Sequence, residues 1–187
     1  MVVKVNKNII NKIRNNIIIK DKKWNNINDT NCYAYALNLD LSYKEINDDS
    51  CFYNVGYISS CYKRILEKEE LVNALINDMK KLGISIKEVN FNYILEENEW
   101  KIALFKTDVY VDDKGRKSTD FHFIRKNYDG YWSHKVGWKD RPEKLENRKD
   151  ILIAPERLNL MIEDNDGNPV KYNYIGTYRL KKKKLRF

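Results

Sequence analysis

The spacing of apolar residues predicts helices in the first half of the chain and strands in the second. Between Ser59 and Gly83, apolar side chains recur every three or four residues, as on one face of a helix. Ser59 and Ser60 carry capping hydroxyls, and Gly83 is a typical helix stop, so we expect a helix over this span. Its core-facing positions are Ile65, Leu66, Leu71, Val72, Leu75, Ile76, Met79 and Leu82.

A second, shorter helix is predicted over residues 31–37. This segment contains no Gly or Pro and includes two alanines, which favour helix formation. Asp29 and Thr30 stand directly before it, with side chains suited to cap a helix. We therefore expect Cys32 to lie in the first turn.

The rest of the chain is strand-like. Runs rich in β-branched and aromatic residues occupy 84–89, 100–107, 109–111, 121–125, 131–135, 151–154 and 172–180. Helices followed by strands with short connections predict an α+β fold, in which a helix packs on an antiparallel sheet. A chain of 187 residues suits one compact domain.

Composition shifts suggest the limits of this domain. Residues 1–28 are rich in Asn, Ile and Lys and are taken as an N-terminal arm with one short helix or strand. Residues 29–180 form the single predicted domain, and residues 181–187, which begin with four lysines, form a basic C-terminal tail.

The formal net charge of +8 favours association with anionic partners but does not identify one. The basic residues lie in no recognisable RNA- or DNA-binding module, so we expect no specific nucleic-acid partner. The N-terminus lacks the continuous apolar core of a signal peptide, and no stretch is long enough to span a bilayer. The expected location is the cytoplasm, and an extracellular target would require lysis or dedicated secretion.

The three cysteines show no paired CxxC spacing and no disulfide framework. Reduced thiols in a cytoplasm fit this number best. Cys51 and Cys61 are expected to be small buried apolar residues, although an oxidising setting would allow them to pair.

Both histidines of the chain lie in one predicted hairpin, over residues 120–135. Residues 127–130 read Asn-Tyr-Asp-Gly, which suits a type I turn that ends in a left-handed glycine and gives a three-residue loop. In this register Ile124 faces His134, so His122 and His134 are diagonal neighbours on one face of the sheet. A two- or four-residue loop would instead place them on opposite faces.

A cysteine, a nearby histidine and an orienting group together form a nucleophilic site. The first turn of a helix favours a thiolate, through the helix dipole and the free N–H groups. We therefore predict Cys32 as the nucleophile, His122 as the general base and His134 as the residue that orients the base.

This arrangement resembles the NlpC/P60 branch of the papain-like cysteine enzymes. The resemblance rests on Cys32 at a helix start, His122 on a strand and His134 twelve residues later across a hairpin, and it covers residues 29–180. Segments 31–37, 120–123 and 132–135 also look like those of a group of bacterial and phage proteins with the same pattern. The usual Asp-Cys-Ser-Gly of the family is replaced here by Asn-Cys-Tyr-Ala at 31–34.

The resemblance implies a papain-like fold and a cofactor-free hydrolase, such as a thiol protease or amidase, or an acyltransferase. The bond would be an amide or isopeptide bond in a peptide, in a peptidoglycan stem peptide or in a protein. Because the motif around the nucleophile differs from that of the family, the resemblance indicates the class of reaction better than it indicates the substrate.

Further site residues follow from the same reasoning. The oxyanion donors are expected to be the backbone N–H of Cys32 and the side chain of Asn31 or Asn26. Trp132, Trp138 and Tyr131 are expected to line a substrate groove, or else to pack as ordinary aromatic residues on the sheet.

Three alternatives remain open. An inert papain-like scaffold would act by binding or inhibiting a partner, and a basic protein would bind nucleic acid through its terminal lysines. One cysteine and two histidines also form a possible zinc set with an open fourth position, but no helical His-Glu-x-x-His motif accompanies them, and we expect no metal. The oligomeric state is not predicted.

Overall fold

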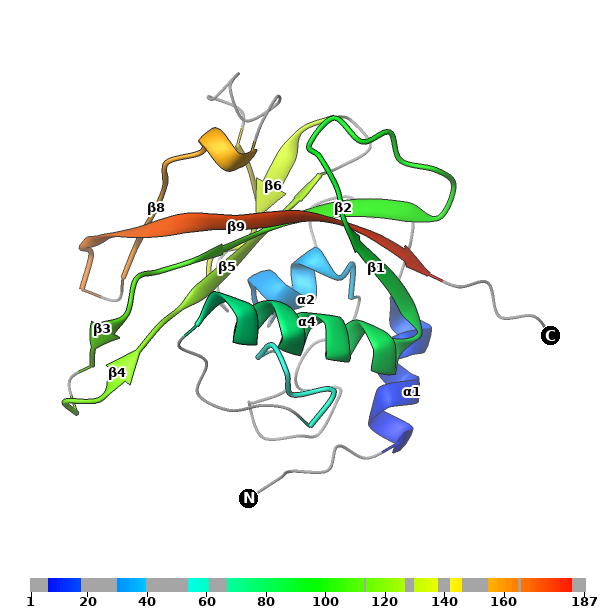
Figure 1. The fold of residues 1–187 in the computed structure, drawn as a ribbon, viewed down its shortest axis with the longest axis horizontal. Helices are drawn as coiled ribbons and strands as arrows, with labels where there is room; N and C mark the ends of the chain where they lie inside the picture. Colours follow the sequence, from blue (N-terminus) through cyan, green and yellow to red (C-terminus); the bar gives the residue numbers. More distant parts are fainter. Residues whose placement is uncertain are drawn as a thin grey trace.

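The protein folds as an α+β structure of helices packed on an antiparallel sheet (Figure 1). The structure, a computed structural model, describes residues 7–17, 30–39, 54–60, 67–112, 114–126, 130–137, 142–145, 155–164 and 166–182. Its helices are α1 (Lys7–Asn16), α2 (Cys32–Ala36) and α4 (Lys68–Leu82), with a 3₁₀ turn η1 (Pro155–Arg157). Its strands are β1 (Ile84–Glu88), β2 (Glu99–Lys106), β3 (Tyr110–Val111), β4 (Lys117–Ser118), β5 (Phe121–Lys126), β6 (Trp132–His134), β7 (Glu143–Lys144), β8 (Leu160–Glu163) and β9 (Pro169–Lys182).

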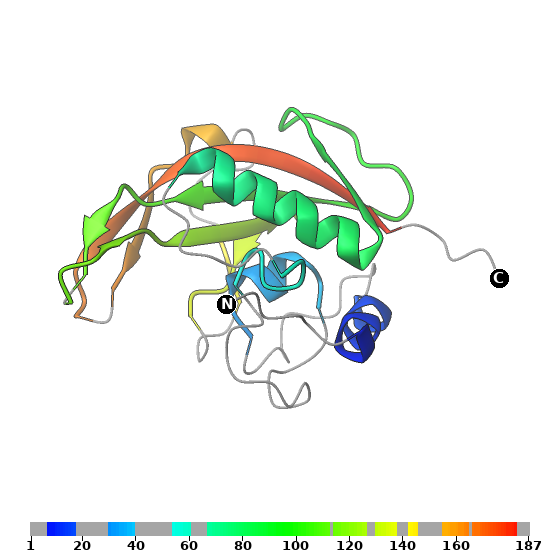
Figure 2. The same ribbon diagram turned by 60° about the horizontal axis from the view of Figure 1, so that its bottom comes forward.

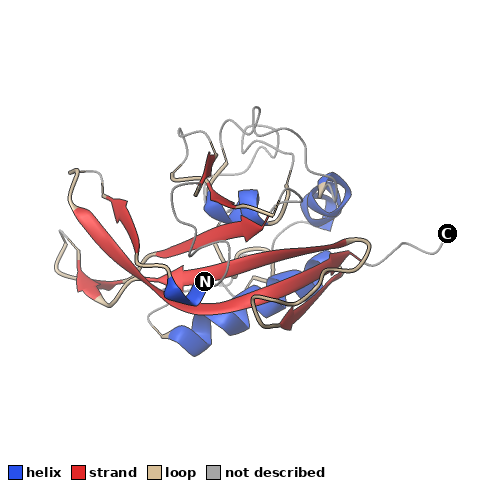
Figure 3. Cartoon of the chain, turned by 90° about the horizontal axis from the view of Figure 1, so that it is seen from above, coloured by secondary structure: helices blue, strands red, loops and turns tan. Residues whose placement is uncertain are grey.

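The main sheet has the strand order β1-β9-β2-β5-β6-β7, with β8 paired to the first part of β9. All of its pairs are antiparallel. Strands β3 and β4 form a separate ribbon that continues the β2–β5 hairpin outward. This ribbon and the β8–β9 hairpin extend together beyond one end of the sheet, opposite the end where β9 finishes (Figures 1 and 3).

Both faces of the sheet are covered, which is why β2 is buried almost throughout. Ile102 and Leu104 join the larger core under α1, α2 and α4, while Ala103 and Phe105 join a second core with β8. This alternation follows from the two-residue period of a strand. Figure 2 shows α2 and α4 on the same side of the sheet.

The predicted long helix is shorter than expected. Helix α4 begins at Lys68, with Glu67 as N-cap, and ends at Gly83, whose φ of 71° is the left-handed conformation that glycine adopts easily. Ser59 and Ser60 do not cap it. They lie in a turn over residues 54–60, because the buried carboxylate of Asp78 accepts the N–H groups of Gly56 and Ser59, each at 2.7 Å. Of the predicted core stripe, Ile76 is 40% exposed, and residues 65 and 66 lie outside the described residues.

Several predicted strands are present, and others were missed. The strands over 84–89, 100–107, 121–125 and 131–135 appear as β1, β2, β5 and β6. The run 109–111 appears as β3, outside the main sheet, and the run 172–180 is the middle of the longer strand β9. The run 151–154 lies outside the described residues. The short strands β4, β7 and β8 were not predicted.

Residues 7–17 of the predicted N-terminal arm pack against the core of the domain, and the rest of the arm lies outside the described residues. In α1 and just after it, Ile13 and Ile17 are fully buried in the larger core. Arg14 Nε donates to the carbonyl of Leu82 at 3.0 Å and fixes α1 against the end of α4. The apolar spacing of Ile9, Ile10 and Ile13 makes one face of α1 apolar, which explains its packing.

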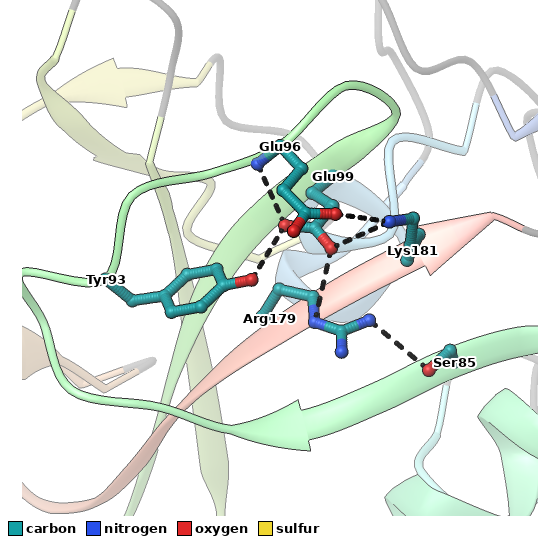
Figure 4. A network of polar contacts seen from close by, with 6 residues as sticks. All are labelled: Ser85, Tyr93, Glu96, Glu99, Arg179 and Lys181. Carbon is teal, nitrogen blue, oxygen red and sulfur yellow. Dashed lines mark hydrogen bonds and ion pairs between the residues drawn. The ribbon is translucent and has the colours of Figure 1, made fainter.

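The predicted basic tail also begins too early, because Lys181 and Lys182 are the last residues of β9 and pair with β1. Figure 4 shows the end of this strand fixed by a polar network around the buried Glu99. Lys181 Nζ lies 2.7 Å from Glu96 and 3.3 Å from Glu99, and Arg179 Nε lies 3.5 Å from Glu99. These ion pairs hold the β1–β2 connection against β9.

No helix within the described ranges has the length and apolar composition required to cross a membrane.

If α1 is part of the core, the substitution Ile13→Ala should lower the free energy of unfolding by about 2 to 5 kcal/mol, since it leaves a cavity. The matched control is Ile94→Ala, at a side chain that is 87% exposed, which should change stability by less than about 0.5 kcal/mol. Urea unfolding followed by circular dichroism measures both. Equal effects of the two substitutions would show that α1 does not contribute to the core.

Candidate functional site

Cys32 is the first residue of α2, as predicted, but the residue that caps this helix is Asn31 and not Thr30, and Asp29 lies outside the described residues. Asn31 Oδ1 accepts the backbone N–H groups of Tyr33 and Ala34, both at 3.1 Å. These are two of the N–H groups that have no partner inside a helix. The cap therefore fixes the backbone on which the thiol stands.

Helix α2 has only five residues, too few to be stable alone, and side chains hold it from both sides. Tyr33 Oη donates to Asp78 Oδ2 on α4 at 2.9 Å. Tyr35 Oη lies 2.6 Å from Ser133 Oγ on β6, and Trp100 Nε1 on β2 donates to the carbonyl of Ala36 at 2.9 Å. The buried guanidinium of Arg125 stacks 4.1 Å above the Tyr35 ring. Contacts from α4, β2, β5 and β6 thus set the position of α2 on the sheet.

The two histidines are brought together by the β5–β6 hairpin in the predicted register. Ile124 is paired with His134, and Gly130 has the left-handed φ of 85° that the three-residue loop requires. His122 Nε2 lies 3.0 Å from His134 Nδ1, a hydrogen-bond distance. The prediction that these imidazoles touch is confirmed.

Burial makes both imidazoles weak bases. His122 is 4% exposed and His134 is 7% exposed. Desolvation lowers the pKa of His122 well below its ordinary value, helped by the neighbouring His134, and lowers the pKa of His134 to about 4. Both rings are therefore neutral near pH 7, and one proton lies between Nε2 of His122 and Nδ1 of His134.

Cys32 lies next to the start of β5, the strand that carries His122, and is not hydrogen-bonded to the histidine pair. Its Sγ is 3.9 Å from the carbonyl oxygen of Phe121, the residue before His122. Among the described residues, no hydrogen bond joins Cys32 to either histidine. Burial raises the pKa of the thiol to about 12; the charge of Asp120 acts in the same direction, while the backbone N–H groups of Phe123 and Tyr33 oppose it. The thiol is therefore protonated in this structure.

The three predicted catalytic residues line one cleft with a volume of about 1510 Å³. The ribbon β3–β4 and the β8–β9 hairpin contribute to its walls, through Tyr110 and Met161 among others. Both polar and apolar side chains line it. The cleft is large enough for several residues of an extended peptide.

Sequence reasoning did not identify Tyr172 as a residue of this cleft. Tyr172 Oη donates to Asp120 Oδ2 at 2.6 Å, and its ring centroid lies 5.9 Å from that of His122. Asp120 Oδ1 also accepts the N–H of Phe121 at 2.8 Å. No local pattern in the sequence brings Tyr172 to the cleft, since the pairing of β9 with β2 shifts register between Leu104 and Phe105.

The other predicted site residues differ in whether they line the cleft. Trp132 is buried in the second core and is not among the residues that line the cleft. Tyr131 is half-buried and is also absent from the cleft lining. Asn31 lines the cleft, but its Oδ1 is used as the helix cap. Asn26 and Trp138 lie outside the described residues.

Within the described parts of the chain, no group of three or more His, Cys, Asp or Glu side chains is arranged to hold a metal ion.

Comparison of the chain with models of protein families, with characterised proteins and with solved structures gives no match. The class that the structure supports is an α+β protein with a buried cysteine and a histidine pair on one cleft.

The histidine pair should make the protein sensitive to acid. Between about pH 6.5 and pH 4, the unfolded chain binds protons on imidazoles that stay neutral in the folded protein, so stability falls as the pH is lowered through this window. For His134 alone the loss is at most on the order of 3 kcal/mol. We expect His134→Asn to lose less stability than the unmodified protein between pH 7 and pH 4.5.

Urea unfolding at the two pH values measures this difference. Glu97→Gln, at an exposed position, is the control and should keep the full loss. The same loss in His134→Asn as in the unmodified protein would contradict a neutral, buried His134.

Proposed function

We propose that the protein is a cysteine-dependent hydrolase or acyltransferase that acts on an amide or isopeptide bond, with a papain-like arrangement close to that of the NlpC/P60 enzymes. The single observation that supports this most is the presence of Cys32, at the start of a helix, and of the hydrogen-bonded pair His122–His134 on one cleft. A nucleophile, a base and an orienting group are the minimum for this chemistry.

The histidine pair can serve as the base in only one tautomer. His122 must donate its Nε2–H to Nδ1 of His134, which leaves Nδ1 of His122 as an acceptor for the thiol proton. His134 then carries its proton on Nε2. In this role His134 is a positioning residue: it selects the tautomer of His122 and stabilises the imidazolium that forms during the reaction.

The reaction begins with transfer of the thiol proton to His122 while Sγ attacks the substrate carbonyl. The imidazolium next protonates the leaving amine as the C–N bond breaks, which gives a thioester at Cys32. Water or a second amine then attacks this thioester, and the thiol is restored. The backbone N–H of Cys32 and the side-chain NH₂ of Asn31 are the proposed donors to the oxyanion.

The raised pKa of the thiol and the lowered pKa of His122 mean that the free protein holds no ion pair between them. Proton transfer must therefore accompany attack on the substrate, and Sγ must first leave the Phe121 carbonyl. The same inactive thiol favours a second candidate, a papain-like scaffold that binds a partner without turnover. The two candidates differ in whether Cys32 is required.

Turnover of peptidoglycan fragments and of a peptide library, measured as release of amines, should fall to background in Cys32→Ala. His122→Ala should lower kcat/KM by about 10²- to 10⁴-fold, the usual contribution of a general base. His134→Asn should keep much of the activity, because the amide oxygen can accept from Nε2 of His122, while His134→Leu should not.

Binding that survives Cys32→Ala with no turnover by the unmodified protein would instead support the scaffold. Circular dichroism of each variant excludes unfolding as the cause of a loss.

The free thiol should react slowly. Iodoacetamide labelling of Cys32, followed by peptide mapping, should be slower at pH 7.5 than labelling of the same residue in urea, and it should increase only as the pH rises well above 9, because the thiol has a pKa of about 12. Fast labelling of the folded protein below neutral pH would contradict a buried neutral thiol and would indicate a preformed thiolate.

A further inference from the structure

The cleft has the opposite charge to the rest of the chain. The formal net charge is +8, yet the described residues that line the cleft include five acidic side chains and one basic side chain, Lys171. The acidic residues are Asp108, Asp120, Glu143, Glu163 and Asp164. A cleft lined by one sign of charge concentrates the field and attracts ligands of the other sign.

Two of these carboxylates are used in local structure. Asp164 accepts the N–H groups of Asp166 and Asn168 in its own turn, at 2.9 and 2.8 Å, and Asp108 accepts Asn173 Nδ2 at 3.0 Å. Asp120 differs from these two carboxylates because it lies next to the proposed catalytic residues. It precedes Phe121, whose carbonyl contacts Cys32 Sγ, and its charge acts on the thiol.

Asp120 is exposed and yet held in one orientation. The N–H of Phe121 and the hydroxyl of Tyr172 each donate to one of its oxygens, at 2.8 and 2.6 Å. Each carboxylate oxygen can accept a further hydrogen bond, so the group remains able to bind an ammonium or guanidinium. An oriented carboxylate of this kind is preorganised for a ligand.

The histidines provide a separate indication that a ligand occupies this part of the cleft. Their side chains are more than nine-tenths buried and line the cleft. Among the described residues, their only hydrogen bond is the one between them, so Nδ1 of His122 and Nε2 of His134 have no protein partner there. Within the described residues, neither nitrogen is among the fully buried polar atoms that lack a partner, so both are open to the cleft, where a bound substrate can hydrogen-bond to them.

We propose, on the basis of the function proposed above, that the cleft selects peptide segments with a lysine or arginine side chain next to the scissile bond, and that Asp120 binds this cation. Val109, Tyr110 and Met161 line the same cleft and can contact the aliphatic part of the side chain. Asp120 is thus a specificity residue, oriented by Tyr172.

This assignment links recognition to reactivity. The carboxylate that binds the cation is also one that opposes ionisation of Cys32, so a bound cation offsets its effect when substrate is present. Lys135 acts on the thiol in the other direction, but its ammonium donates to the carbonyl of Gly137, and it does not line the cleft. When the bound peptide carries no cationic side chain, the negative charge of Asp120 continues to oppose ionisation of Cys32.

The test uses binding to the Cys32→Ala variant, which requires no turnover. The probes are two acetylated and amidated pentapeptides, Ala-Ala-Lys-Ala-Ala and its norleucine analogue, titrated by NMR. The lysine peptide should bind about fivefold or more tightly than the norleucine peptide, and the preference should weaken with added salt. Adding Asp120→Asn should remove the preference, and adding the control Glu97→Gln should keep it.

Equal affinity for the two peptides, or a lysine preference that survives Asp120→Asn, would overturn the proposal. Iodoacetamide labelling provides a second readout: Asp120→Asn alone should speed the labelling of Cys32 severalfold at pH 8, and Glu97→Gln should not. An unchanged rate in Asp120→Asn would contradict the link to reactivity. If catalysis fails, the binding result is unaffected; if the lysine preference fails, Cys32-dependent turnover can still be observed.

Discussion

Everything proposed for this protein depends on holding a five-residue helix in place. Helix α2 cannot be stable through its own backbone hydrogen bonds, so its position is set by two tyrosines that leave it on opposite sides. Tyr33 reaches Asp78 on α4, and Tyr35 reaches Ser133 on β6 and lies against Arg125. These anchors are large, buried and polar at the tip, which gives both packing area and direction. The thiol is thus positioned by the sheet and by α4 more than by its own helix.

The same burial that fixes the site also keeps it inactive. A helix start and a nearby imidazole are expected to favour a thiolate, but desolvation outweighs them here, and Cys32, His122 and His134 are all neutral. A buried, protonated thiol reacts slowly with oxidants and alkylating agents. Its chemistry then depends on what enters the cleft.

Local patterns in the sequence were enough to predict the histidine pair. One glycine fixed the loop length, the loop length fixed the register, and the register placed His122 beside His134. Tyr172 could not be found in this way, because its position depends on a bulge in pairing between strands far apart in the chain. Helix α1 was not predicted as part of the core, because its Asn- and Lys-rich composition hid an apolar face. For Trp132, composition alone could not decide between a substrate groove and ordinary packing, and the residue is buried in the second core.

Strand β9 has a consequence for how the chain folds. It is the last described strand, yet it lies between β1 and β2 and also pairs with β8 (Figure 1). Strand β1 therefore cannot join the rest of the sheet until this segment is present. The first residue of β1 is paired with Lys182, 98 residues later, and the first residue of β2 with Lys181, 82 residues later. Contacts so distant in sequence close large loops and form late, at a rate set by chain topology. Until then, β2 has an unpaired edge, so the nascent chain needs protection from aggregation while this strand is being completed.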